Sequence, residues 1–207
     1  MQHILVETNW VVGVAAPSHH RRHDALDLLE HAARGEFTIE VPAFCFSEAR
    51  EPIRRKAPRN EADAIRTYLS WAKGVGVVTT ESDVAVRQVL DQFESRTKAE
   101  IAAVDHRLAE IRAMPNVNVF PLREPMLALA VDPRLLKLGL QPFDLAVLAA
   151  VLGRAVELRD SGEVDLTFCE IDEDLLPWRR DGSVRGDLQA LYRDHGLDVE
   201  NRFVLAV

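Results

Sequence analysis

The sequence predicts an α/β fold, a three-layer α/β/α sandwich in which helices cover both faces of a mainly parallel sheet. Two observations indicate this class. Short apolar segments alternate along the chain with longer segments of helical periodicity. The apolar segments also lack the alternation of polar and apolar residues that a sheet with one solvent-exposed face shows.

Five segments are predicted to be strands, because each is short, apolar and bounded by polar or turn-forming residues. They are 3–7, 37–41, 117–120, 164–169 and 202–207. The segment 74–80 (GVGVVTT) is ambiguous between a strand and a connector. We expect 117–120 to be the third core strand.

Helices are predicted between these strands, with starts at polar capping residues and ends at glycine. They cover 18–34, 43–51, 60–73, 82–113 and 124–130, and a last one opens at Gln141-Pro142-Phe143-Asp144. Pro52 should kink or restart the second helix, because its ring clashes with the carbonyl of Glu48. The helix after Pro142 (DLAVLAAVLGRAVEL) is apolar nearly all round, so the fold must cover it on most sides.

The long helical segment 82–113 lies outside the alternating pattern, and we interpret it as an elaboration of the core. Apolar residues recur in it at every third or fourth position from Val86 to Ile111. This stripe is expected to pack against the body or a partner subunit, which makes a homodimer one interpretation. A clamp over the substrate is the alternative.

The 207 residues are predicted to form a single domain, 1–207, with the elaboration at 82–113 and a C-terminal extension at 177–207. Cys45 and Cys169 are far apart and form no C-x-x-C motif, which argues against a zinc ribbon, an iron–sulfur site or a disulfide scaffold. The longest apolar segment, 145–152, is too short to cross a bilayer, and a strand begins almost at Met1. We therefore expect no membrane partner and a cytoplasmic location.

The charge balance of 25 basic against 33 acidic residues gives a net charge of −8, which argues against a protein that coats DNA non-specifically. The distribution is uneven. Residues 49–59 carry a local excess of positive charge, whereas 160–174 contain acids and no base. This pattern predicts one edge that attracts phosphate and another that concentrates cations.

Carboxylates occur where the predicted strands end or the following helices begin, and this constellation carries the chemistry. Glu7 ends the first strand, Glu48 lies in the helix after the second, and Asp144 lies in the first turn of the apolar helix. Asp172 and Asp174 follow the strand 164–169. Because ligands bind outside the carboxyl ends of strands in open α/β sheets, these acids are expected to converge at one edge.

Converging carboxylates repel one another unless a cation lies between them. Mg²⁺ takes oxygen ligands and keeps several waters, so it tolerates a loose ring of carboxylates, and it assists phosphodiester hydrolysis by activating water. Each acid also has an alternative interpretation that involves no metal. Glu7 could be a surface acid at the end of a strand, and Asp144 an acid that interacts favourably with the helix dipole. Asp172 and Asp174 could be solvated turn residues, and Glu48 could pair with an arginine of its own helix.

The segments ILVETN, VPAFCFSEAR, LQPFDLAVLAAVLGRA and LTFCEIDEDL, in this order, resemble the motifs of the PIN domain nucleases. The resemblance spans residues 3 to about 176. It implies a parallel α/β/α sandwich, dependence on Mg²⁺ or Mn²⁺, and endoribonuclease activity on RNA. Many bacterial members are toxins, which further implies an antitoxin protein as a partner.

Carried over residue by residue, the resemblance makes Glu7, Glu48, Asp144 and Asp172 the catalytic, metal-ligating acids. It makes Asp174 an auxiliary metal ligand and Asn9 a residue that positions substrate or water. From their charge, Arg50, Arg54 and Arg55 are candidate contacts to the RNA backbone.

The departure from the family pattern is Glu7, where the family usually has Asp. The extra methylene moves the carboxylate, so a binding or regulatory module with a degenerate site on the same fold is the alternative function. A nucleotide-binding enzyme of the Rossmann type ranks lower, because NWVVGVAAP follows the first strand in place of G-x-G-x-x-G.

Overall fold

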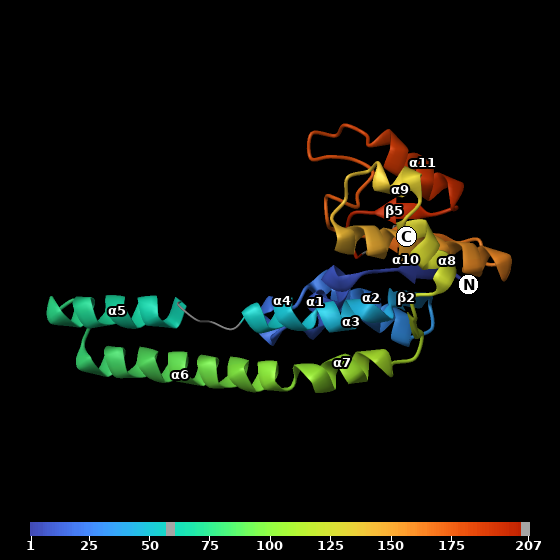
Figure 1. Cartoon of the computed structure of the whole chain (residues 1–207). Helices are drawn as coiled ribbons and strands as arrows, with labels where there is room; N and C mark the ends of the chain where they lie inside the picture. The colour runs from blue at the N-terminus through green and yellow to red at the C-terminus, as the bar shows by residue number, and fades with distance from the viewer. Residues whose placement is uncertain (57–60, 204–207) are drawn as a thin grey trace.

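A five-stranded, all-parallel sheet lies at the centre of the computed structural model, which describes residues 1–56 and 61–203 (Figure 1). The strand order is β3-β2-β1-β4-β5. Helices flank the sheet on both sides, so the α/β class and the parallel sheet predicted from the sequence are confirmed. The strands are β1 (His3–Leu5), β2 (Thr38–Pro42), β3 (Val117–Phe120), β4 (Leu166–Cys169) and β5 (Asp198–Glu200).

The sheet grows outward from β1 in two directions, and this fixes where a ligand can bind. β1 pairs with β2 on one side and β4 on the other, so that Ile4 lies between Ile39 and Thr167. The chain first moves from β1 to β2 and β3, then crosses back to β4 and β5. The strand order therefore reverses between β1 and β4, and their carboxyl ends flank the crevice of the sheet.

Because crossovers between parallel strands are right-handed, the two directions of growth place helices on opposite faces. Figure 1 shows the helices that precede β3 on one side of the sheet and those that follow it on the other. The first layer contains α1 (Thr8–Ala15), the short η1 (Ser18–His20), α2 (His23–Ala33), α3 (Ala43–Glu48), α4 (Arg50–Arg55) and α7 (Val104–Arg112). The second contains α8 (Glu124–Ala130), α9 (Pro133–Leu136), α10 (Pro142–Asp160) and α11 (Gly186–Asp194).

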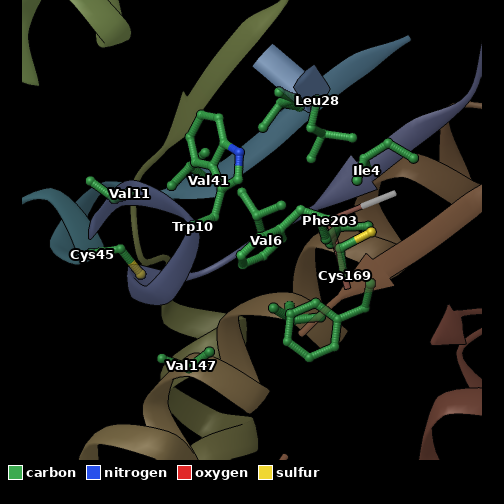
Figure 2. Close-up of a cluster of buried hydrophobic side chains, with 14 of the residues drawn as sticks. Ile4, Val6, Trp10, Val11, Leu28, Val41, Cys45, Val147, Cys169 and Phe203 are labelled. Carbon is green, nitrogen blue, oxygen red and sulfur yellow. The ribbon is translucent and has the colours of Figure 1, made fainter. Parts of the chain in front are cut away.

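The core is built from the apolar strands and the apolar faces of α1, α2 and α10. Trp10 of α1 is fully buried, and its indole donates to the carbonyl of Ala25 at 3.2 Å. Figure 2 shows Trp10 with Ile4 of β1, Leu28 of α2 and Phe203 in one cluster. The α10 residues from Val147 to Leu152 are all buried, as the all-round apolar pattern of this helix predicts.

Two helices extend away from the sheet, α5 (Glu61–Gly74) and α6 (Thr80–Ala102), and we call them the helical arm (Figure 1). They run antiparallel, with a turn at Gly76, whose φ of +75° is one that glycine adopts readily. The segment 74–80 is therefore the end of a helix and a turn, and 117–120 is the third strand, as expected.

Several boundaries differ from the sequence prediction. The single helix predicted over 82–113 is two helices, α6 and α7, separated at Ala103, and the side chain of Arg107 donates to the carbonyl of Glu100 at this break. The break expected near Pro52 occurs at Ala49, between α3 and α4. The predicted cap Asn60 lies outside the described residues.

The strand predicted over 202–207 is wrong in the part that the structure describes. Strand β5 lies at 198–200, and Arg202 and Phe203 form a bend after it, while 204–207 lie outside the described residues. Phe203, an apolar residue of the predicted strand, packs in the core instead and is 1% exposed. Residues 177–203, predicted as an extension, supply α11 and the edge strand β5.

Helix α1 was not predicted, because TNWVVGVA lacks a polar face and its β-branched residues are typical of strands. The burial of most of its residues stabilises this helix, although the intrinsic helix propensity of its sequence is low. None of the helices within 1–56 and 61–203 combines the length and apolarity needed to cross a membrane.

Candidate functional site

A pocket of about 430 Å³ lies at the carboxyl ends of β1 and β4, where the strand order reverses. Four acids from four separate segments line it: Glu7, Glu48, Asp144 and Asp172. The sequence prediction that these carboxylates lie at one edge of the sheet agrees with their place in this pocket. The remaining lining is Thr8, Asn9, Val12, Pro52, Arg55, Lys56, Phe143 and Leu175.

Glu7 lies between β1 and α1 and caps that helix. Its Oε1 accepts the backbone N–H of Asn9 at 2.6 Å, and the residue is 4% exposed. Burial raises the pKa of the Glu7 carboxyl well above its usual range, and the charge of Glu170 raises the pKa further. The hydrogen bond from Asn9 opposes both effects without cancelling them.

Glu170 is the acid that the sequence reasoning missed. It directly follows β4 and is fully buried, and its Oε1 accepts the backbone N–H groups of Ile171 and Asp172, both at 2.7 Å. Its Oε2 is buried without a hydrogen-bond partner. Burial raises the pKa of Glu170 to about 7, although those two hydrogen bonds lower it. Its position at the end of a buried strand, inside the acidic run 160–174, was the available signal.

Asp144 and Glu48 approach the pocket from the helices on opposite faces of the sheet. Asp144 lies in the first turn of α10, and burial raises the pKa of its carboxyl, with a further contribution from the charge of Asp172. Glu48 ends α3, and its Oε2 is buried without a hydrogen-bond partner. The charges of Glu48 and Asp172 also raise the pKa of Glu7, so these acids repel one another through the pocket.

No described cation neutralises these acids: within 1–56 and 61–203, none of Glu7, Glu48, Asp144 and Asp172 forms an ion pair. The alternative interpretation, in which Glu48 pairs with an arginine of its own helix, is therefore not observed among these residues. The backbone N–H of Asp174 donates to Asp172 Oδ1 at 2.9 Å. Asp174 is exposed and lies outside the pocket lining, although its charge contributes to the raised pKa of Asp144.

Of the arginines predicted to contact phosphate, one lines the pocket and two lie elsewhere. Arg55 lines the pocket and pairs with Glu51 at 3.0 Å, and Lys56 lines the pocket beside it. Arg50 instead donates to Asp105 of α7 at 2.7 Å, and Arg54 lies 3.9 Å from the same carboxylate. Arg50 and Arg54 therefore anchor α4 to α7, away from the acids.

The acids line an open pocket rather than a closed cage. Within the described ranges, no three side chains among His, Cys, Asp and Glu are arranged so that they hold a metal ion together. In most protein sites Mg²⁺ is bound by one or two carboxylates and keeps several waters. A pocket of this volume accommodates a hydrated ion and still leaves room for part of a substrate.

Comparison of the chain with protein-family models, with curated proteins and with solved structures finds no match.

Proposed function

We propose that this chain is a divalent-metal-dependent endoribonuclease of the PIN type, acting on cytoplasmic RNA. One observation carries the proposal. Four carboxylates from distant segments line one pocket at the reversal of the strand order, and none has a cation partner among the described residues. Carboxylates gathered in this way repel one another, and a bound divalent cation relieves the repulsion.

The residues present fit Mg²⁺ or Mn²⁺. The donors are all carboxylates, which suit these ions, and the buried Oε2 of Glu48 has no partner within the protein. Glu7, Glu48, Asp144 and Asp172 would surround the metal and contact it directly or through its bound waters, with Asp174 in an outer position. When bound, the ion supplies Lewis-acid stabilisation of the charge that develops on a phosphodiester.

The other residues of the pocket position the substrate. Arg55 and Lys56 place positive charge at the rim of an otherwise acidic pocket, where it attracts the RNA backbone. Asn9 lies at the first turn of α1 and lines the same pocket as the acids. Glu170 fixes the backbone of Ile171 and Asp172 and so orients the Asp172 carboxylate.

The second candidate function is a binding or regulatory module whose site no longer cleaves RNA. The observation in its favour is Glu7, which is engaged as a helix cap and whose raised pKa favours the neutral acid. A neutral carboxyl is a weaker metal ligand than a carboxylate, so a Glu7 that keeps its proton would bind the metal weakly.

The decisive experiment measures cleavage of a single-stranded RNA library with Mn²⁺, with and without EDTA. Asp144→Asn and Glu48→Gln should each lower the rate by about 100-fold or more, the scale of removing one group that stabilises transition-state charge. Asp63→Asn, an exposed acid on the helical arm, is the matched control and should keep full activity. Undiminished cleavage in both pocket variants would exclude the proposed mechanism, and metal binding without cleavage by the wild type would favour the regulatory module.

A toxin role and an antitoxin partner are further proposals that depend on the resemblance to PIN nucleases. Growth arrest on expression, rescued by the product of an adjacent gene, would support them. Harmless overexpression of protein that cleaves RNA in vitro would count against them.

A further inference from the structure

The helical arm carries large apolar side chains that stay largely exposed among the residues that the structure describes. On α5, Ile65, Tyr68 and Trp71 recur every three residues and therefore lie on one stripe. Tyr68 and Trp71 are 61% and 58% exposed, and their rings contact each other at 5.6 Å. On α6, Val86, Val89 and Phe93 form a corresponding stripe, in which Val89 is 63% exposed.

The contacts between the two helices place these stripes level with each other. Lys73 pairs with Asp83 at 3.2 Å, Arg87 donates to Ser70 at 2.9 Å, and Arg66 pairs with Asp91 and Glu94. In the antiparallel register that these bonds define, each apolar residue of α5 lies opposite one of α6. The level pairs are Ile65 with Phe93, Tyr68 with Val89 and Trp71 with Val86.

Both stripes also lie on the same side of the arm. On α5 the buried residues Leu69 and Ala72 face α6, and on α6 the buried residue Asp83 faces α5, where it pairs with Lys73. At 100° per residue, the exposed stripe lies about a quarter turn from the buried one, in the same rotational sense on both helices. For antiparallel helices the same sense gives the same side, so the six residues form one apolar face.

Among residues 1–56 and 61–203, the body of the protein contacts this face at its base. The ring of His19 in η1 packs edge-on against Phe93 at 4.7 Å, and Ser18 bonds to Glu100 and Arg96. Beyond Phe93 the arm extends away from the sheet (Figure 1). Large exposed apolar patches bordered by polar residues mark interaction sites on soluble proteins.

The charged residues of 64–75 and 82–93 lie off this face. All of them, Arg66, Lys73, Asp83, Arg87 and Asp91, take part in the ion pairs that join α5 to α6 or in pairs within a helix. The face is bordered instead by small or neutral residues, Ala64, Thr67, Ser82 and Ala85. Depletion of charge and enrichment of aromatic residues are typical of the centre of an interface.

We propose that a second copy of this chain covers the apolar face, and that the two arms pack as an antiparallel four-helix bundle. A copy carries net charge −8, so two copies approach with least repulsion through a face without charge. The patch has bulky aromatic residues beside alanines, which lets one copy's rings pack over the other's small residues. Two helical hairpins with apolar faces form such bundles with a two-fold axis.

The exposed area is sufficient for this interface. Tyr68 and Trp71 each leave roughly 100–150 Å² uncovered, given the 150–250 Å² that such side chains bury when fully covered. The other four apolar residues and the bordering residues add to this. The total approaches the roughly 800 Å² per partner of an interface of standard size.

The experiment is size-exclusion chromatography with light scattering, over a range of concentrations of the full chain. The wild type is expected to reach twice the chain mass of 23.2 kDa as concentration rises. The double variant Tyr68→Glu, Trp71→Glu should weaken self-association by about 100-fold or more, because two central aromatic residues are replaced by charges. The double variant Val131→Glu, Val164→Glu is the matched control, since both residues are exposed but lie outside the arm.

Far-ultraviolet circular dichroism checks that the arm variant is folded. The separate single variant Trp71→Phe keeps the apolar face and should therefore still form the dimer. A wild type that stays monomeric at every concentration overturns the proposal. This holds even if the apolar face then binds a helix of a different protein, because the proposed partner is a second copy of this chain. A dimer that persists in the arm variant, or dissociates equally in the control, overturns it as well.

Discussion

The pocket and the helical arm both carry acids, but the acids of the two regions differ in whether a cation neutralises them. On the arm, Asp83, Asp91 and Glu94 each bond to an arginine or lysine of the neighbouring helix or turn. In the pocket, Glu7, Glu48 and Asp144 have no cation partner within the described residues, and burial raises the pKa of Glu7 and Asp144. A buried acid without a partner is costly to the folded state, whereas the acids of the arm are compensated by neighbouring cations. The difference supports the proposal that the pocket acids bind a ligand.

The core around the sheet and the helical arm also differ in how far their tryptophans are buried. Trp10 is fully buried between α1 and α2, whereas Trp71 projects from the arm. Trp10→Ala is expected to lower the free energy of unfolding by about 3–5 kcal/mol, because it leaves a cavity in the core. Trp71→Ala should change it by about 0.5 kcal/mol or less, as at other surface positions. Urea denaturation of both variants at low protein concentration, where subunits are dissociated, measures the difference, and equal losses would contradict it.

Metal addition should affect the pocket alone. At a concentration one hundred times its dissociation constant, Mn²⁺ is expected to stabilise the folded protein by about 2.7 kcal/mol through mass action. Thermal unfolding of Asp144→Asn should show no such stabilisation, while Asp63→Asn on the arm should respond like the wild type. A melting temperature that Mn²⁺ leaves unchanged, or raises equally in Asp144→Asn, would rule out the proposed metal site.

Removal of one negative charge should have opposite consequences in the two regions. Burial raises the pKa of Glu170 to about 7 from an ordinary 4.5, so the folded state holds this proton more tightly than the unfolded state. Stability therefore falls as the pH rises from about 4.5 to about 7 and stays low above it. Glu170→Gln keeps the acceptor for the N–H groups of Ile171 and Asp172, and it should raise stability at pH 8 by an amount on the order of 2 kcal/mol.

The matched change on the arm is Glu94→Gln, which weakens the ion pair with Arg66 and should slightly lower the melting temperature at the same pH. Thermal unfolding of both variants between pH 4.5 and 8 tests this contrast. A Glu170→Gln protein with the same pH dependence as the wild type would show that Glu170 does not titrate in this range.

Helical periodicity and strand signals predicted much of the fold. Strand β3 and helix α8 match their predicted bounds, because Asn116 and Pro121 flank the strand and Glu124-Pro125 opens the helix. Helix α1 was missed because its sequence lacks a polar face, and it is stabilised mainly by the packing of residues such as Trp10 in the core. Strand β5 was misplaced because backbone pairing with β4 decides it, while the apolar Phe203 that suggested a strand enters the core.

The sequence by itself determined the parallel α/β architecture and the positions of the acids along it, because apolar periodicity and strand ends are local properties. Only the tertiary structure decided that Glu7, Glu48, Asp144 and Asp172 share one pocket while Arg50 and Arg54 turn to Asp105. It alone revealed Glu170, whose burial depends on elements packed from both faces of the sheet. The direction of a side chain and its loss of water depend on neighbours that are distant in sequence, and no local pattern contains them.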